Sequence, residues 1–168
     1  MGGCFNLRFF MEYIDECGYL GNLELLDGQA VAFVAESATP ESEWVKVEQW
    51  LNDEIFGKNR SVMSTFQSPF ERRVLRLLFE HNHPTILYTS EQLYDSLPTE
   101  YRVSSATPQM LALFQGREYP SLTSFDRYDL AMMNLADEVV TIGINPESPT
   151  QKLVEVFRSQ SNTPYRAL

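Results

Sequence analysis

The amino-acid sequence predicts an α/β fold: a single Rossmann-like, doubly wound domain with a mostly parallel sheet of about six strands and helices on both faces. Three junctions support this prediction, because at each one an apolar run ends and a Ser or Thr followed by Pro opens a helical pattern. They are Thr39-Pro40, Ser68-Pro69 and Ser148-Pro149. A Ser or Thr side chain can cap the free N–H groups of a helix start, and Pro is tolerated in the first turn. Repeated strand-to-helix turns of this kind are typical of doubly wound sheets.

Short apolar runs are the expected strands, since continuous apolarity is typical of strands that are covered on both faces. They lie at residues 31–35, 61–63, 85–88, 111–115, 139–142 and 165–168.

Between these runs, apolar residues recur at the spacing of amphipathic helices. The expected helices cover residues 41–56 and 69–80, a short stretch after Ser90, a stretch from 124 or 125 to 135, and a last stretch after Pro149. Ser68 with Glu71, and Ser148 with Gln151, have the spacing of capping boxes. A short leading helix over 7–16 and a turn-rich approach over 21–28 precede the first strand. We therefore expect a helical leader over residues 1–20 and one domain over residues 21–168.

Composition and charge limit the function classes. The chain has 168 residues and 43% hydrophobic content, which suits one domain with a sizeable core. It carries 13 basic and 23 acidic side chains, a formal net charge of −10, so nucleic acid is the less favoured partner. Two cysteines, Cys4 and Cys17, favour a reducing compartment. No secretion signal or membrane span is recognised, so a cytoplasmic protein without membrane contact is predicted.

Common cofactor motifs are absent from the sequence. The segment after the first strand is Ala35-Glu36-Ser37-Ala38-Thr39-Pro40 instead of a Gly-rich dinucleotide fingerprint, and no Walker A sequence occurs. We predict no cofactor. The histidine pair at His81 and His83 falls at the end of the sheet opposite the expected site, so no metal site is predicted either.

The predicted sheet brings three loops to one edge, where the parallel strands end. Hydroxyl groups and helix N-termini at this edge could bind one anionic ligand. Helix capping explains the same residues without a ligand, and the two interpretations can coexist. The candidate ligand-binding residues are Glu36, Ser37, Ser64, Thr65, Ser68, Arg127, Ser148 and Thr150.

The same edge carries opposing charges. Arg117 and Arg127 are the cations expected nearest to it, either to bind a phosphate or to neutralise acidic residues. Acidic groups at helix N-termini are stabilising and repel phosphate, and solvated helix caps are favoured over a divalent-cation site for them. These acidic residues are Glu36, Glu41 and Glu147, with Asp126 and Asp129.

An ordered set of motifs resembles a known family. The segments are 21–26 (GNLELL), 31–35 (VAFVA), 64–71 (STFQSPFE), 135–140 (LADEVV) and 145–150 (NPESPT). Together they resemble the Rossmann-like domain of DNA-processing protein A (DprA, or Smf). The nearest likeness is to its short, stand-alone bacterial relatives, in the superfamily that also contains the Lonely-guy phosphoribohydrolases. Where the family has a Gly, this chain has Thr65 and Glu147, and residues 128–130 replace an Arg-Asn-Arg element.

The resemblance implies a DprA-like domain that binds a nucleotide or nucleotide-derived ligand at the C-terminal edge of the sheet, with a link to DNA processing. Because the family's phosphate-facing glycines and arginines are replaced, we expect a binding protein and not an enzyme. Two alternatives stay open. One is a phosphoribohydrolase-like enzyme, for which Glu147 is the candidate catalytic carboxylate, and the other is a degenerate relative that binds a protein. Family relatives often dimerise, so a homodimer is a further expectation, with Trp50 or Phe56 at its surface.

Overall fold

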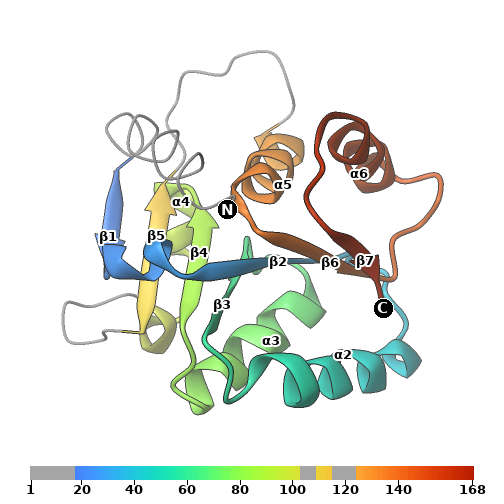
Figure 1. The fold of residues 1–168 in the computed structure, drawn as a ribbon. Helices are drawn as coiled ribbons and strands as arrows, with labels where there is room; N and C mark the ends of the chain where they lie inside the picture. The colour runs from blue at the N-terminus through green and yellow to red at the C-terminus, as the bar shows by residue number, and fades with distance from the viewer. Residues whose placement is uncertain (1–17, 103–108, 115–123) are drawn as a thin grey trace.

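A seven-stranded sheet forms the middle layer of the structure, with helices packed on both faces (Figure 1). This computed structural model describes residues 18–102, 109–114 and 124–168. The strand order is β1-β5-β4-β3-β2-β6-β7, in which β1 is antiparallel to β5 and every other pair is parallel. The strands are β1 (Tyr19–Gly21), β2 (Gln29–Ala35), β3 (Arg60–Ser64), β4 (Thr85–Thr89), β5 (Met110–Phe114), β6 (Glu138–Ile142) and β7 (Tyr165–Ala167). The Rossmann-like α/β prediction is therefore confirmed, with the short edge strand β1 as an addition.

The helices alternate with the strands, as right-handed parallel crossovers require. Helices α2, α3 and α4 cover one face of the sheet, and α5 and α6 cover the other (Figure 1). They are η1 (Leu23–Asp27), η2 (Glu41–Glu43), α2 (Trp44–Trp50), the π-helical segment η3 (Leu51–Ile55), α3 (Pro69–Glu80), α4 (Glu91–Asp95), η4 (Thr99–Tyr101), α5 (Ser124–Leu135) and α6 (Pro149–Gln160). The predicted leading helix over 7–16 lies outside the described residues.

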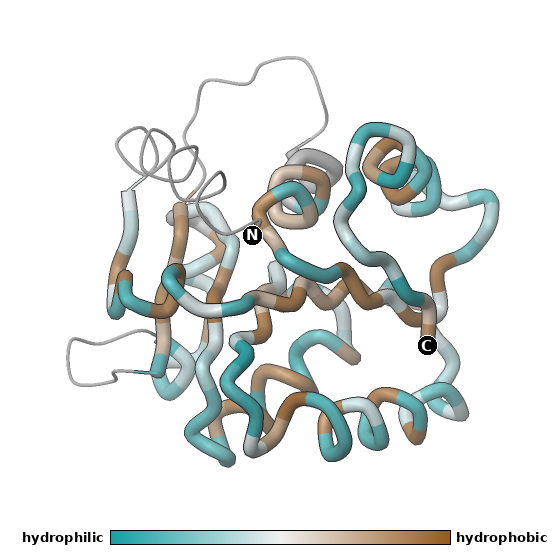
Figure 2. The backbone as a smooth tube through the Cα atoms, in the orientation of Figure 1, coloured by the Kyte–Doolittle hydropathy of each residue, from teal (hydrophilic) through white to brown (hydrophobic). Residues whose placement is uncertain are grey.

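Strand β2 shows why the apolar run over residues 31–35 is continuous. Its side chains alternate between the faces, because successive residues of a strand point to opposite sides. Val31 and Phe33 belong to the core under α2 and α3, whereas Ala32 and Val34 belong to the core under α5 and α6. Hydrophobic residues accordingly run along the strands and on the stretches of helix that pack against them (Figure 2). The sheet therefore has a hydrophobic core on each side.

Two of the predicted helix caps are present. Ser68 forms a complete capping box with Glu71, and the Ser148 side chain accepts a hydrogen bond from the N–H of Gln151. The second box is incomplete, since the Gln151 side chain donates to Glu155 at 3.1 Å instead.

The third predicted cap, at Thr39, is wrong. The Thr39 hydroxyl donates to the carbonyl of Glu36 at 2.7 Å and caps no helix. A 3-10 turn, η2, begins after Pro40, and α2 begins only at Trp44.

The predicted dimer surface at Trp50 is also wrong. Trp50 is 3% exposed, and its ring stacks on that of Phe33 with a centroid separation of 5.3 Å. It therefore packs between α2 and the sheet. Phe56 is half-buried and stacks on His81, with 3.9 Å between the ring centroids.

The direction of the connections reverses next to β2. Strand β3 follows β2 on one side, while β6 pairs with β2 on the other side. In open α/β sheets, ligands bind in the crevice beyond the carboxyl ends of the strands at such a switch point. No described helix is both long and apolar enough to cross a membrane.

Candidate functional site

A cleft of about 170 Å³ lies at this edge of the sheet. It gathers residues from the end of β2, the β3–α3 loop and the helices α3, α4, α5 and α6. The lining residues are Ala35, Glu36, Ser37, Thr65, Gln67, Ser68, Glu71, Leu93, Asp129 and Thr150. A cavity of this size is smaller than the roughly 300–1,000 Å³ of typical drug-sized pockets, so it suits one ring-sized group of a ligand.

The loop after β2, which lines the cleft, is hydrogen-bonded to the loop after β6. The Glu36 side chain accepts a hydrogen bond from the N–H of Asn145 at 3.1 Å, and its other carboxyl oxygen is buried without a hydrogen-bond partner. Thr39 packs against Gly143, which has φ +63. A Cβ at Gly143 would lie 2.4 Å from Thr39 Cγ2, so only glycine fits this contact.

The loop between β3 and α3 forms the floor of the cleft. Ser64 is fully buried, and its hydroxyl accepts a hydrogen bond from the N–H of Phe66 at 3.2 Å. Phe66 is also buried and adopts φ +51, a left-handed conformation that is uncommon outside glycine. This turn directs the chain into α3. It also orients the N–H groups of the next two residues, Gln67 and Ser68, toward the same point.

That point is occupied by the carboxyl group of Glu71, which is 3% exposed. One oxygen accepts the N–H groups of Gln67 at 2.8 Å and Ser68 at 3.1 Å, with the Thr65 hydroxyl at 3.4 Å. The other oxygen accepts the N–H of Ala35, at the end of β2, at 3.0 Å. Burial raises the pKa of the Glu71 carboxyl, and these hydrogen bonds oppose the rise. Glu71 thus joins the first turn of α3, the loop before it and the central strand.

Helix α6 contributes Thr150, whereas its capping residues face their own backbone. The Ser148 hydroxyl accepts the N–H of Gln151 at 3.1 Å. Glu147 is exposed, its N–H donates to the Asn145 side chain at 2.9 Å, and it does not line the cleft.

The structure brings together five of the eight candidate residues: Glu36, Ser37, Thr65, Ser68 and Thr150. Ser64 and Ser148 lie beside the cleft without lining it, and each satisfies a local backbone N–H. Arg127 lies on α5, in a stretch whose side chains are outside the described part of the structure. The side chain of Asp126 and the whole of Arg117 are likewise outside it.

Sequence reasoning missed four lining residues, Ala35, Gln67, Glu71 and Leu93. Glu71 was recognised only as the far half of a capping box. Its bond to Ala35 joins residues 36 positions apart, and no local pattern carries that signal.

The described lining is rich in hydrogen-bond acceptors. It contains three carboxyl groups and the hydroxyls of Ser37, Thr65, Ser68 and Thr150, and no Lys or Arg is among the described lining residues. Carboxylates accept hydrogen bonds from hydroxyl and amine donors and repel phosphate. Across the residues that the structure describes, no three His, Cys, Asp or Glu side chains are grouped as a metal site would need.

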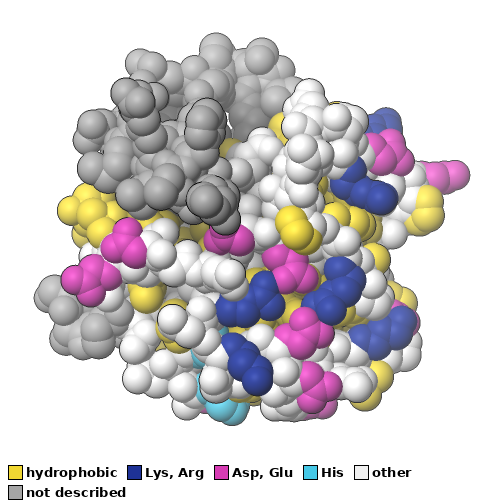
Figure 3. Space-filling view, in the orientation of Figure 1, with side chains coloured by type: hydrophobic (Ala, Val, Ile, Leu, Met, Phe, Trp, Pro, Cys, Tyr) yellow, Lys and Arg dark blue, Asp and Glu magenta, His cyan; other side chains and the backbone are white. Residues whose placement is uncertain are grey.

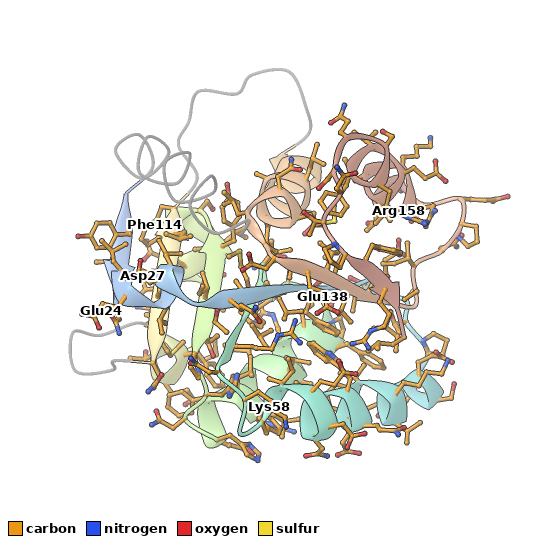
Figure 4. The ribbon with its side chains drawn as sticks, viewed as in Figure 1. Glu24, Asp27, Lys58, Phe114, Glu138 and Arg158 are labelled. Atoms are coloured by element: carbon orange, nitrogen blue, oxygen red, sulfur yellow. The ribbon has the colours of Figure 1, made fainter. Side chains whose placement is uncertain are left out.

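The opposite edge of the sheet carries an ion-pair network. Arg60, at the start of β3, pairs with Glu138, and Arg166 pairs with Glu54 at 2.6 Å and Glu138 at 3.6 Å. Figure 4 labels Glu138 at the start of β6. On the face drawn in Figure 3, basic and acidic side chains alternate and do not form one basic patch. These paired charges serve to join η3 to the strands.

The two histidines also lie at this opposite edge. His81 ends α3, with its Nδ1 2.8 Å from the carbonyl of Leu77, and His83 contacts the carbonyl of Arg60 at 2.6 Å. Burial lowers the pKa of His83, although the bond to Arg60 opposes this.

Comparison of the chain with models of known protein families, with curated proteins and with solved structures gives no significant match.

Proposed function

We propose that this protein is a DprA-like, non-enzymatic domain that binds a nucleotide-derived small molecule in the cleft beyond β2. The observation that carries the proposal is the position of the cleft. It lies at the switch point between β2 and β6, where α/β sheets of this type bind their ligands.

The chemistry of the residues that line the cleft supports the binding of a nucleoside-like group. Glu36 directly follows the first parallel strand and is one of the residues that line the cleft. A carboxylate can accept hydrogen bonds from the hydroxyl groups of a ribose. Ser37 and Thr150 add hydroxyl groups that can donate to or accept from the same sugar.

The geometry favours binding over hydrolysis. A phosphoribohydrolase needs a carboxylate at the scissile bond, and the candidate Glu147 lies outside the cleft lining. Glu71 is fully engaged by backbone N–H groups, so it is not free to act as a base.

Thermal unfolding with a ligand panel tests the proposal. The panel contains ribonucleosides, their 5′-monophosphates, ADP-ribose, NAD and short single-stranded DNA. A ligand at about 100 times its dissociation constant adds roughly 2.7 kcal/mol of stability, and each kcal/mol raises the Tm of a domain of this size by about 2–4 °C. We expect a shift of several degrees with one nucleoside-containing class.

Two variants locate the binding site. Thr150→Val removes a cleft hydroxyl with little change of shape, and the loss of one hydrogen bond weakens binding roughly 2- to 10-fold. Thr99→Val, at an exposed position in η4, is the matched control and leaves binding unchanged. Equal effects of the two variants would place the ligand elsewhere.

A further inference from the structure

The β3–α3 loop has the geometry of an anion site. Phe66 adopts φ +51, and the N–H groups of the next two residues, Gln67 and Ser68, converge on a single oxygen atom. Successive N–H groups in such a turn form a concavity that binds anions, and the N-terminus of the twelve-residue helix α3 adds a favourable dipole. A loop of this kind holds the phosphate in many nucleotide-binding proteins.

In this protein the site is already filled by the chain itself. The oxygen on which the two N–H groups converge belongs to Glu71, at 2.8 Å from Gln67 N and 3.1 Å from Ser68 N. The second oxygen of the same group takes the N–H of Ala35 at 3.0 Å. The two convergent N–H groups of this loop are therefore already bonded and are not available to a phosphate.

The rest of the cleft also disfavours a phosphate. Glu36 and Glu71 both line it, and each contributes a carboxyl group. Like charges at such short range repel, and the repulsion is strong where water is partly excluded. The hydroxyls of Ser37 and Thr150, by contrast, suit a neutral partner with its own hydroxyl groups.

We infer that the cleft binds the neutral sugar of a nucleoside and selects against a 5′-phosphate, because Glu71 occupies the anion site of the β3–α3 loop. This inference rests on the proposed function and names its ligand class. A cavity of about 170 Å³ accommodates a single ring such as a pentose, with the base extending outside it.

The first test compares adenosine, guanosine, cytidine and uridine with their 5′-monophosphates by calorimetric titration of the wild-type protein. We expect the bound nucleoside to have at least tenfold higher affinity than its monophosphate, and inorganic phosphate not to compete. Tighter binding of the monophosphate would overturn this inference and leave the proposed function standing. No binding of either class would overturn both.

The second test empties the anion site. Glu71→Ala removes the carboxyl group and frees the N–H groups of Gln67 and Ser68. Glu71→Gln, the matched control, keeps an acceptor of the same length in the loop. We expect inorganic phosphate to raise the Tm of Glu71→Ala at constant ionic strength and to leave the wild type and Glu71→Gln unchanged.

Two results of this second test would contradict the inference. One is that phosphate stabilises the wild type as much as Glu71→Ala, and the other is that a folded Glu71→Ala does not respond to phosphate. If Glu71→Ala does not fold, the titration of the wild type with nucleosides and monophosphates decides.

Discussion

The carboxyl group of Glu71, in the first turn of α3, accepts the backbone N–H of Ala35, the last residue of β2, at 3.0 Å. The pairing of β2 with β3 ends at Ala32 and Met63. At Ala35, three residues further along β2, the Glu71 side chain therefore accepts the backbone N–H in place of strand β3. The same group binds the loop before α3. One side chain therefore fixes the central strand relative to the helix that begins beside the cleft.

This relationship predicts a large loss of stability for Glu71→Ala. The substitution leaves three backbone N–H groups without partners, and each unpaired buried donor costs about 1–3 kcal/mol, so we expect a loss of about 3 kcal/mol or more. Denaturant unfolding measures it. Glu48→Ala, at an exposed position on α2, is the control and should change stability by less than about 0.5 kcal/mol. A loss below about 1 kcal/mol at Glu71 would contradict its structural role.

Gly143 is predicted to tolerate no side chain. Gly143→Ala places a Cβ 2.4 Å from Thr39 Cγ2 at a backbone φ of +63. The left-handed conformation alone costs about 1–2 kcal/mol, and the contact with Thr39 adds to it. Gly57 is a matched control, because it has φ +75 with nothing within 4 Å of an added Cβ. Thermal unfolding should show a larger loss for Gly143→Ala than for Gly57→Ala; equal losses would mean that the Thr39 contact has no effect.

The buried imidazole of His83 predicts a loss of stability as the pH falls below about 6.5. Burial holds its pKa in the folded protein below the ordinary value of 6.5, so near and below that pH the unfolded chain binds more protons than the folded one. Stability therefore falls as the pH is lowered through this window. His83→Gln should reduce the fall. His81→Gln, at an exposed position, keeps the buried imidazole and removes only the smaller effect of the His81 charge, so it should retain most of the fall. Equal pH profiles for the wild type and His83→Gln would refute this explanation.

The ion pair between Glu54 and Arg166 predicts a separate loss of stability at lower pH. The hydrogen bond and charge of Arg166 hold the pKa of Glu54 below 4.5, with a smaller effect of Arg60, and partial burial opposes the shift. Because the unfolded chain takes up this proton first, the stability from the pair is present above about pH 4.5 and is lost as the pH falls through the lower pKa of the folded state. Glu54→Gln should remove this part of the acid response. Glu80→Gln, which removes the exposed pair with Arg76 at 3.7 Å, serves as the control and should leave the response in place.

The parts of the fold that follow from local chemistry could be predicted from the sequence. Residues 31–35 are apolar on both faces, so β2 was recognised, and Ser68 followed by Pro69 and Glu71 marks the start of α3. Thr39-Pro40 has the same local pattern but forms a turn, because the Thr39 hydroxyl bonds to Glu36 and packs on Gly143. Local sequence does not reveal that competition.

The candidate site was predictable in its position but not in its chemistry. Parallel strands end at one edge, so the loops after β2, β3 and β6 could be brought together from the sequence alone. The contacts from which we infer the ligand preference are long-range, as in the bonds from Ala35 to Glu71 and from Asn145 to Glu36. For the same reason Trp50 was expected at a surface, whereas it stacks on Phe33 in the core.

The most direct measurement is the titration of the wild-type protein with a ribonucleoside and with its 5′-monophosphate under the same conditions. The account predicts that a nucleoside binds, that its monophosphate binds at least tenfold more weakly, and that Thr150→Val weakens the binding of the nucleoside. A monophosphate that binds more tightly than its nucleoside would contradict the role of Glu71 as the occupant of the anion site. The absence of binding by both classes would contradict the proposed function itself.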